Sequence, residues 1–288
     1  MIISIASGKG GTGKTTVAVN LALTLSESED IQLLDCDVEE PNAHLFLRPE
    51  IKESYPVTIP VPVIDEEKCD HCGKCSQFCE FNALAVLESG VMVFEELCHG
   101  CGGCGIVCPK NAITERNREI GQIEKGFAKN YADKNLAFAL GRLNIGEAMA
   151  SPLIRKVKEE IDRGKTAILD VPPGTSCPVI ESIYGSDCCL LVTEPTPFGL
   201  YDLKLAVGLL KKLGIPFGIV INRSTGEKDG DRDVEEYCRK EKAPVLMKIP
   251  YDRQIAELYS KGVPFIEEML GWKKEFLNLL ARVREIVE

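Results

Sequence analysis

The chain has 288 residues, 44% of them hydrophobic and 27% charged, the composition of a globular protein with one or two domains. Its net charge of −10 argues against a nucleic-acid partner bound by phosphate neutralisation, and no apolar run approaches the ~20 residues that cross a bilayer. The chain opens on an apolar run without a signal peptide, and its thirteen cysteines show no disulfide framework. We therefore expect a reducing, cytoplasmic location.

The N-terminal segment predicts a strand, a glycine-rich loop and a helix in succession. Residues 1–7 are a short apolar run, and the loop GKGGTGKT follows at 8–15. Val17, Leu21 and Leu25 then recur at helical spacing. Strand, loop and helix in this order are the context in which G-x-x-x-x-G-K-[ST] holds nucleotide phosphates, whereas a chance match would be an ordinary glycine turn.

The residues of this loop predict a nucleotide site with magnesium. The backbone N–H groups from Gly10 to Lys14 would surround phosphate oxygens at the helix N-terminus. Lys14 would reach the β- and γ-phosphates, and the Thr15 hydroxyl would bind Mg²⁺. A second predicted strand, IQLLDCD, ends in the carboxylates Asp35 and Asp37.

The residue pattern of the chain changes from about residue 49. Residues 54–68 contain three prolines and alternate like an edge strand or a linker. We therefore divide the chain into residues 1–60, an insert at 61–116, and residues 117–288, which continue the first segment.

The insert contains two cysteine runs with the same spacing, C-x2-C-x2-C-x3-C. This spacing is typical of bacterial ferredoxins with two [4Fe–4S] clusters, in which the fourth cysteine of each run ligates the cluster of the other run. We expect one cluster on Cys69, Cys72, Cys75 and Cys108 and a second on Cys79, Cys98, Cys101 and Cys104. Structural zinc is the alternative, but it favours C-x2-C pairs separated by longer loops. His71 and His99 recur at the same place in each run and are expected to hydrogen-bond to cluster sulfides.

After the insert, apolar strands alternate with helices. The expected strands are 121–126, 136–146, 188–195, 216–223 and 244–250, and residues 166–174 are expected to be a strand that runs into a loop. The expected helices are 152–164, which Gly164 ends, 199–214 and 272–288, and residues 235–241 are expected to be part of a helix. Continuous apolar strands are typical of a parallel sheet buried on both faces. We therefore expect an α/β fold, a mainly parallel sheet with helices on both faces, interrupted by an inserted bacterial-type ferredoxin domain with two [4Fe–4S] clusters. The charges of the last helix nearly cancel, so packing on the sheet is favoured over membrane binding.

The lysine at the second position of GKGGTGKT gives the chain a resemblance to the deviant Walker A ATPases. That family includes MinD- and ParA-type ATPases, the nitrogenase iron protein and Mrp-type iron–sulfur cluster carriers. The resemblance implies a P-loop ATPase that forms an ATP-dependent homodimer, in which Lys9 reaches the nucleotide of the other subunit. It also implies that Asp37 activates the attacking water and that Asp170, at the end of the strand AILD, holds Mg²⁺ together with Thr15 and Asp37. Cys177 is then either an inert thiol or a ligand of a bridging cluster between subunits.

By the same resemblance Asn222 recognises adenine, and residues 249–264 close the pocket. The catalytic residues implied are Lys9, Lys14, Asp37 and Asp170. The residues expected to bind ATP are Gly8, Lys9, Gly10, Gly11, Thr12, Gly13, Lys14, Thr15, Thr16, Asn222, Arg223 and Pro250.

Three functions fit these expectations. The favoured one is an ATPase whose nucleotide state gates electron transfer by two clusters to an unidentified redox or metalloprotein partner. The alternatives are an iron–sulfur cluster carrier that serves maturation of other proteins, and a redox-sensing ATPase of the MinD/ParA positioning type. Each would use ATP or ADP, Mg²⁺ and two [4Fe–4S] clusters, with no nucleic acid and no stable membrane insertion.

Overall fold

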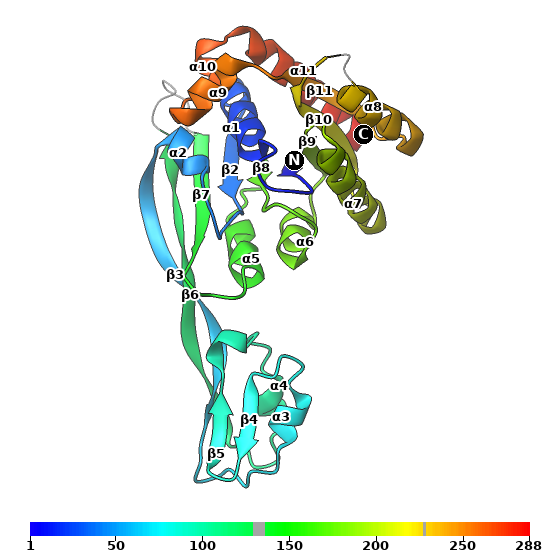
Figure 1. The fold of residues 1–288 in the computed structure, drawn as a ribbon. Coiled ribbons are helices and arrows are strands. Elements are labelled where there is room, and N and C mark those ends of the chain that lie inside the picture. Colours follow the sequence, from blue (N-terminus) through cyan, green and yellow to red (C-terminus); the bar gives the residue numbers. More distant parts are fainter. Residues whose placement is uncertain (129–135, 227–228) are drawn as a thin grey trace. The chain divides into compact units, whose positions relative to one another are not determined.

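The computed structural model describes residues 1–128, 136–226 and 229–288 (Figure 1). The chain forms two compact units. The first unit comprises Met1–Ser54, Ile123–Arg142 and Ile154–Glu288, and the second unit comprises Tyr55–Gln122 and Leu143–Leu153.

The main sheet has nine strands in the order β11-β10-β9-β1-β8-β2-β7-β6-β3. They are β1 (Ile2–Ala6), β2 (Ile31–Asp35), β3 (Pro49–Ile64), β6 (Ile113–Ala128), β7 (Leu136–Leu143), β8 (Thr166–Asp170), β9 (Cys188–Thr193), β10 (Phe217–Ser224) and β11 (Val245–Pro250). Every neighbouring pair from β11 to β7 is parallel, which confirms the predicted mainly parallel sheet. The proline-containing β3 is the edge strand, one of the two options that its sequence left open.

The helices outside the cysteine runs connect or follow these strands. They are α1 (Lys14–Leu25), α2 (Ala43–Leu47), α5 (Ser151–Glu159), α6 (Cys177–Ile183), α7 (Pro197–Leu213), α8 (Asp229–Glu241), α9 (Arg253–Ser260), α10 (Phe265–Glu268) and α11 (Gly271–Val287). None of the helices in the described ranges has both the length and the hydropathy that a membrane crossing requires.

The sheet reverses its winding direction at its centre. The connection from β1 to β2 passes β8 in one direction, whereas the connection from β8 to β9 passes β1 in the other. Because both crossovers are right-handed by rule, α1 and α6 fall on opposite faces of the sheet. The carboxyl ends of β1 and β8 therefore meet at a topological switch point, where sheets of this kind bind their ligands.

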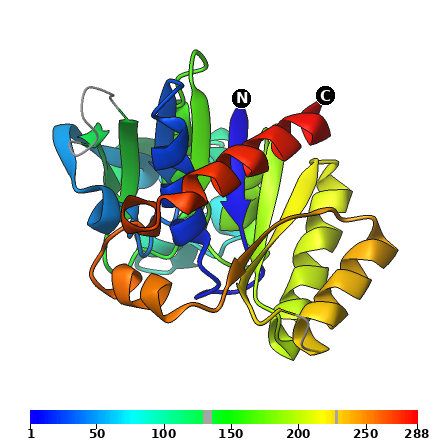
Figure 2. The same cartoon turned by 90° about the horizontal axis from the view of Figure 1, so that it is seen from above.

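The core of the first unit lies between the sheet and the helices α1 and α11, which cover one face of the sheet. Val17 and Leu21 of α1 and Phe276, Leu279 and Val283 of α11 are buried there. Figure 2 shows α11, in red, running across the sheet beside α1. This arrangement confirms that the C-terminal helix packs on the sheet.

Several predicted boundaries are wrong. Strand β6 begins at Ile113, not at residue 121, and β7 ends at Leu143, not at residue 146. At two further boundaries a carboxylate turns the chain early. The helix α5 ends at Glu159, not at Gly164, because the Asp162 side chain accepts the Gly164 N–H at 2.9 Å in a turn that follows the helix. Strand β2 ends at Asp35, not at Asp37, since the Asp35 carboxylate accepts the Asp37 N–H at 3.1 Å.

The second unit contains an antiparallel hairpin and three short helices. These are β4 (Leu84–Leu87) with β5 (Gly90–Val93), α3 (Lys74–Phe78), α4 (Gly103–Ile106) and the 3₁₀ turn η1 (Glu95–Leu97). The two cysteine runs fold alike. Gly73 and Gly102 cap α3 and α4 with φ of 76° and 71°, a left-handed conformation that glycine adopts without strain.

Candidate nucleotide site and candidate cluster sites

The glycine-rich loop of residues 8–15 connects β1 to α1 and is held by β10. Gly13 caps α1 with φ of 94°, and a Cβ atom there would lie 2.3 Å from Asn222 Nδ2. That same Nδ2 donates a hydrogen bond of 2.7 Å to the Thr12 carbonyl. The loop therefore requires glycine at position 13, and Asn222 is bound to the loop itself.

Thr15 and Asp170 meet at the carboxyl edge of the sheet, where Mg²⁺ is expected. The Thr15 hydroxyl donates to Asp170 Oδ2 at 2.5 Å. Asp170 Oδ1 is buried and has no hydrogen-bond partner in the described part of the chain. A hydroxyl and a carboxylate oxygen with free coordination capacity are the donors that Mg²⁺ prefers, so these residues fit the ion.

Asp35 organises the loop that carries Asp37. Its fully buried carboxylate accepts N–H groups of Asp37 at 3.1 Å, Asn42 at 2.9 Å and Ala43 at 3.0 Å. These bonds fold residues 37–43 back over the end of β2 and present Asp37 to the nucleotide loop. The sequence placed Asp35 at a strand end but gave no sign of this role.

Burial raises the pKa values of all three carboxyl groups. Burial raises the pKa of Asp37 to about 6, against the opposing effect of Lys14. The pKa of Asp170 rises to about 7, with burial as the main cause and the Thr15 hydrogen bond and Lys14 opposing it. Asp35 also has a raised pKa, because it is buried and faces Asp170. Such a group of carboxyls is stabilised in its charged form when a cation binds.

A cavity of about 310 Å³ in the first unit opens beside the loop. The predicted residues that line it are Gly10, Gly11, Gly13, Lys14, Thr15, Thr16, Asp37, Asn222, Arg223 and Pro250. Four predicted residues do not line it: Gly8, Lys9, Thr12 and Asp170. The sequence missed Glu40 and Asn42 as lining residues. Five further lining residues come from the segment expected to close the pocket: Tyr251, Asp252, Ile255, Ala256 and Tyr259.

Lys9 lies outside the cavity and forms an ion pair. Lys9 Nζ is 3.5 Å from Glu194 Oε2, and its side chain remains 32% exposed. Arg223 contacts the other oxygen of the same carboxylate. Gly8 packs against α7, where an added Cβ would lie 2.3 Å from the Asp202 carbonyl oxygen. Glu194, at the end of β9, therefore binds both cations that flank the loop.

The eight motif cysteines line two separate cavities in the second unit. A cavity of about 430 Å³ is lined by Cys79, Cys98, Cys101 and Cys104. A smaller cavity of about 20 Å³ is lined by Cys69, Cys72, Cys75 and Cys108. Each cavity thus receives three cysteines from one run and the last cysteine of the other.

The last cysteine of each run is oriented by the same turn. The Asn82 and Asn111 backbones have φ of 53° and 49°, and the N–H of the alanine after each donates to a cysteine sulfur at 3.3 Å. The acceptors are Cys79 and Cys108. Sulfur atoms that accept backbone N–H groups and face a cavity with three further thiols suit an iron–sulfur cluster.

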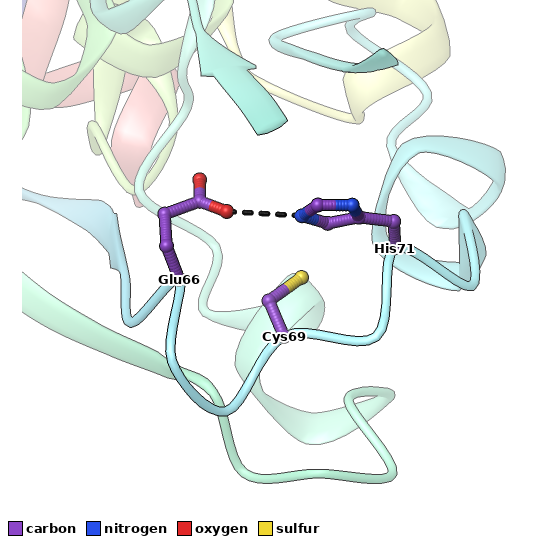
Figure 3. A group of neighbouring side chains, drawn as sticks. All are labelled: Glu66, Cys69 and His71. Atoms are coloured by element: carbon purple, nitrogen blue, oxygen red, sulfur yellow. Dashed lines mark hydrogen bonds and ion pairs between the residues drawn. The ribbon is translucent and has the colours of Figure 1, made fainter. Parts of the chain in front are cut away.

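The two histidines of the runs have different contacts with protein side chains. His71 Nε2 lies 3.0 Å from Glu66 Oε2. Figure 3 shows these two side chains joined by a dashed line, with Cys69 beside the pair. Glu66 also accepts the Val91 N–H at 3.2 Å. His99 instead stacks on Phe81, with ring centroids 3.4 Å apart.

The remaining cysteines lie outside these cavities. Cys177 is exposed at the start of α6, and Cys36, Cys188, Cys189 and Cys238 are buried. Burial raises the pKa of Cys189 to about 12, so this thiol stays protonated.

The sequence matches the family model described as CobQ/CobB/MinD/ParA nucleotide binding domain over residues 3–265. An uncharacterised protein of Methanocaldococcus jannaschii is 35% identical, covering 94% of this chain and 97% of that protein. The iron-sulfur cluster carrier protein of Pyrococcus abyssi is 25% identical, covering 92% of this chain and 78% of that protein. Among solved structures, the septum site-determining protein MinD of Pyrococcus horikoshii, complexed with Mg-ADP, superimposes with a TM-score of 0.57 at 21% identity, covering 98% and 95% of the two chains. That likeness shows a common fold.

Proposed function

Because the chain belongs to the CobQ/CobB/MinD/ParA nucleotide-binding domain family, we propose that it is an Mg²⁺-dependent ATPase whose nucleotide state gates electron transfer by two [4Fe–4S] clusters. The observation that carries the proposal is the sorting of eight cysteines into two cavities by the crossed pattern of two-cluster ferredoxins. The same chain also contains a phosphate-binding loop and, at the carboxyl edge of the sheet, the Thr15 and Asp170 side chains that suit Mg²⁺.

In the nucleotide site, each residue has a separate task. The buried Lys14 meets the phosphate charge, and the loop N–H groups hold the phosphate oxygens in a fixed geometry. Thr15 and Asp170 would hold Mg²⁺, which would neutralise phosphate charge. Asp37, presented by Asp35, orients the attacking water. Its raised pKa suits a group that accepts a proton near neutral pH.

In the second unit, the cysteines would hold the clusters, which supply one-electron redox chemistry when bound. Each cluster would take ligands from both runs, so release would require both runs to open together. This crossed attachment favours resident clusters over transferable ones. The unit carries eleven carboxylate side chains against five Lys and Arg side chains, so a redox partner with a basic surface is favoured.

A second candidate is an iron–sulfur cluster carrier. It is supported by the 25% identical relative that carries this name and matches over most of both chains. Under this reading the clusters are cargo, and nucleotide binding would alter how firmly the cysteines hold them.

Redox titration beside a transfer assay distinguishes the two functions. Anaerobically purified protein should contain about eight iron and eight sulfide per chain, as two cubanes require. Mg-ATP should shift at least one midpoint potential, and the clusters should stay with the protein when an apo-ferredoxin acceptor is added. Unchanged potentials together with ATP-stimulated transfer to the acceptor would favour the carrier, and stoichiometric zinc without sulfide would overturn both.

A further inference from the structure

We propose that a redox partner protein docks over the larger cysteine cavity, here called the Cys98 cavity, and places a lysine or arginine side chain between Glu80 and Glu115. This inference rests on the proposed function. It adds which of the two clusters exchanges electrons with the partner, and at which surface. All residues that carry it belong to the second unit, every residue of which the structure describes.

The two cysteine cavities differ in size although the same turns build them. In each run a left-handed glycine caps the helix, and an alanine N–H donates to the sulfur of the last cysteine. The Cys98 cavity has a volume of about 430 Å³, whereas the smaller one, here called the Cys69 cavity, has about 20 Å³. Because both would hold the same kind of cluster, the cluster does not account for the larger volume. The Cys98 cavity therefore has room for a group from outside the chain.

The walls of the two cavities also differ. The Cys69 cavity is lined by the aliphatic side chains of Ile64, Val86, Val91 and Ile113. The Cys98 cavity is lined instead by the rings of Pro60, Pro62, Phe78, Phe81 and His99. Phe78 is 49% and Phe81 is 41% exposed, and the Phe81 ring stacks on His99 with centroids 3.4 Å apart. Exposed aromatic rings bind both the charge and the apolar stem of a basic side chain.

The charges that line the two cavities favour a cation at only one of them. Glu80 and Glu115 line the Cys98 cavity, and no lysine or arginine is among its described lining residues. Neither carboxylate forms an ion pair within the described part of the chain. The Cys69 cavity is lined by two lysines and one aspartate, and its Lys110 Nζ lies 3.8 Å from Asp70. A basic partner is therefore attracted to the Cys98 cavity and not to the Cys69 cavity.

The strand β6 directs Glu115 toward the cysteine turn and keeps its own arginines away. Side chains alternate along a strand, so Glu115 lies on the opposite face of β6 from Arg116 and Arg118. Glu115 Oε1 lies 3.2 Å from the position that a Cβ atom on Gly102 would take. Gly102 follows Cys101, one of the cysteines that line the cavity. The charge of Glu115 is therefore held beside the cluster ligands without a cation from its own strand.

The position of this surface decides which cluster meets the partner. A basic side chain between Glu80 and Glu115 would lie beside the four cysteines of the Cys98 cavity. Electron transfer is fastest over the shortest distance, so the cluster held by Cys98 would exchange electrons with the partner. In this step the cluster loses one electron and the one-electron centre of the partner gains it, with no bond formed or broken. Electrons from the cluster held by Cys69 would leave through the same surface.

Cytochrome c, a basic one-electron haem protein, serves as the probe in the test. Calorimetry of the full-length, cluster-loaded protein with ferricytochrome c measures binding at low ionic strength, and no electron passes because both proteins are oxidised. Glu115→Lys should weaken binding about tenfold, and Glu80→Gln should weaken it in the same direction by less. Added salt should reduce the difference from the wild type, because it screens exposed charges.

A matched charge reversal separates the docking surface from the net charge of the unit. Glu88→Lys makes the same change in the exposed turn between β4 and β5, whose Val86 and Val91 line the Cys69 cavity. It should leave binding within about twofold of the wild type, because screening limits the reach of an exposed charge. Glu115→Asp keeps the charge and should bind nearly as the wild type does. Equal weakening by Glu88→Lys and Glu115→Lys, or none by Glu115→Lys, would overturn the inference.

Stopped-flow oxidation of the protein, reduced beforehand with one equivalent of dithionite, gives a second measurement. Glu115→Lys should slow oxidation by ferricytochrome c and speed oxidation by ferric-EDTA, a small anion, so a folding defect cannot produce both changes. Tighter binding of methyl viologen, a small aromatic dication, than of cytochrome c would identify a small ligand as the occupant and overturn the docking of a protein. Absence of iron and sulfide from the wild-type protein would instead overturn the proposed function.

Discussion

At the scale of single residues, three carboxyl groups lie at one edge of the sheet: Asp35 and Asp170 are buried, and Asp37 is half-buried. A cluster of this kind opposes its own ionisation, and Asp170 even keeps one oxygen buried without a hydrogen bond in the described structure. Its cost is offset when a divalent cation arrives, since the ion binds the charged forms. The site is therefore organised for metal and nucleotide together rather than for the empty protein.

The free energy of unfolding should depend on pH because these carboxyl groups oppose their own ionisation in the folded protein. In the folded protein the pKa of Asp170 is raised to about 7 from an ordinary value of 3.8, so between these values the folded state holds a proton that the unfolded state lacks. The stability contributed is present at low pH and is lost as pH rises through 7. In EDTA, the melting temperature of the wild type should therefore fall more between about pH 5.5 and pH 8 than that of Asp170→Asn.

Saturating Mg-ADP, in buffer without EDTA, serves as the control for this measurement. It should reverse the loss at high pH in the wild type, because ligands that bind only the folded state stabilise it. The same pH dependence in the wild type and in Asp170→Asn would contradict the assignment of a raised pKa to this residue.

An element could be predicted from the sequence when the residues that begin and end it lie within or next to it, and not when a distant residue caps it. The β1–loop–α1 unit and the long α7 could be predicted because apolar periodicity and an end signal coincide: α7 starts after Thr196, whose hydroxyl accepts the Gly199 N–H at 3.0 Å, and stops at Gly214. The short α2 could not, since it is capped by Asp35, a residue eight positions earlier. Local patterns do not reveal such contacts.

In the nucleotide site too, residues of one contiguous motif could be predicted, whereas contacts between residues far apart in the sequence could not. The loop glycines, Lys14 and Thr15 follow from one contiguous motif. The bond from Asn222 to Thr12 joins residues 210 positions apart, and the pairing of Lys9 with Glu194 depends on the order of strands in the sheet. Sequence spacing alone contains neither contact, which is why Glu194 was missed as a partner.

Two glycines should respond to alanine in opposite directions. In β6, a Cβ on Gly126 would lie 1.9 Å from the Glu50 carbonyl oxygen in β3, so Gly126→Ala should force the edge strands apart and destabilise the protein by roughly 1–3 kcal/mol. In α7, Gly208 has no heavy atom within 4 Å of its Cβ position, and Gly208→Ala should stabilise by about 0.5–1 kcal/mol. Urea unfolding of both variants measures the difference. An unchanged midpoint in Gly126→Ala would show that β3 yields easily at this point.

The whole molecule combines a nucleotide site and two cysteine cavities in one chain, and the proposed function requires them to communicate. Coupling between two ligands is reciprocal: if ATP shifts a cluster potential, reduction of that cluster must shift ATP affinity by the same free energy. The conformation or assembly of the protein that changes when nucleotide binds must therefore alter both the ATP affinity and a cluster potential. A dimer formed only with ATP would be one such state, and we propose that Lys9, which lies outside the nucleotide cavity of its own chain, senses it.

Lys9→Ala tests this state directly. In the single chain Lys9 contacts Glu194 and does not line the nucleotide cavity, so the variant should bind ATP with near wild-type affinity. If Lys9 reaches the nucleotide of a second subunit, the variant should remain monomeric with Mg-ATP, and hydrolysis should fall roughly 10²–10³-fold, the loss typical for removal of one transition-state donor. Lys156→Ala, which removes an exposed lysine paired with Glu159, should change neither property. Light scattering, turnover and redox titration on the same samples complete the test, because ATP should shift the cluster potentials in Lys156→Ala and not in Lys9→Ala. A dimeric, active Lys9→Ala protein would mean that the lysine acts within its own subunit, and that the signal from nucleotide to clusters does not pass through dimerisation.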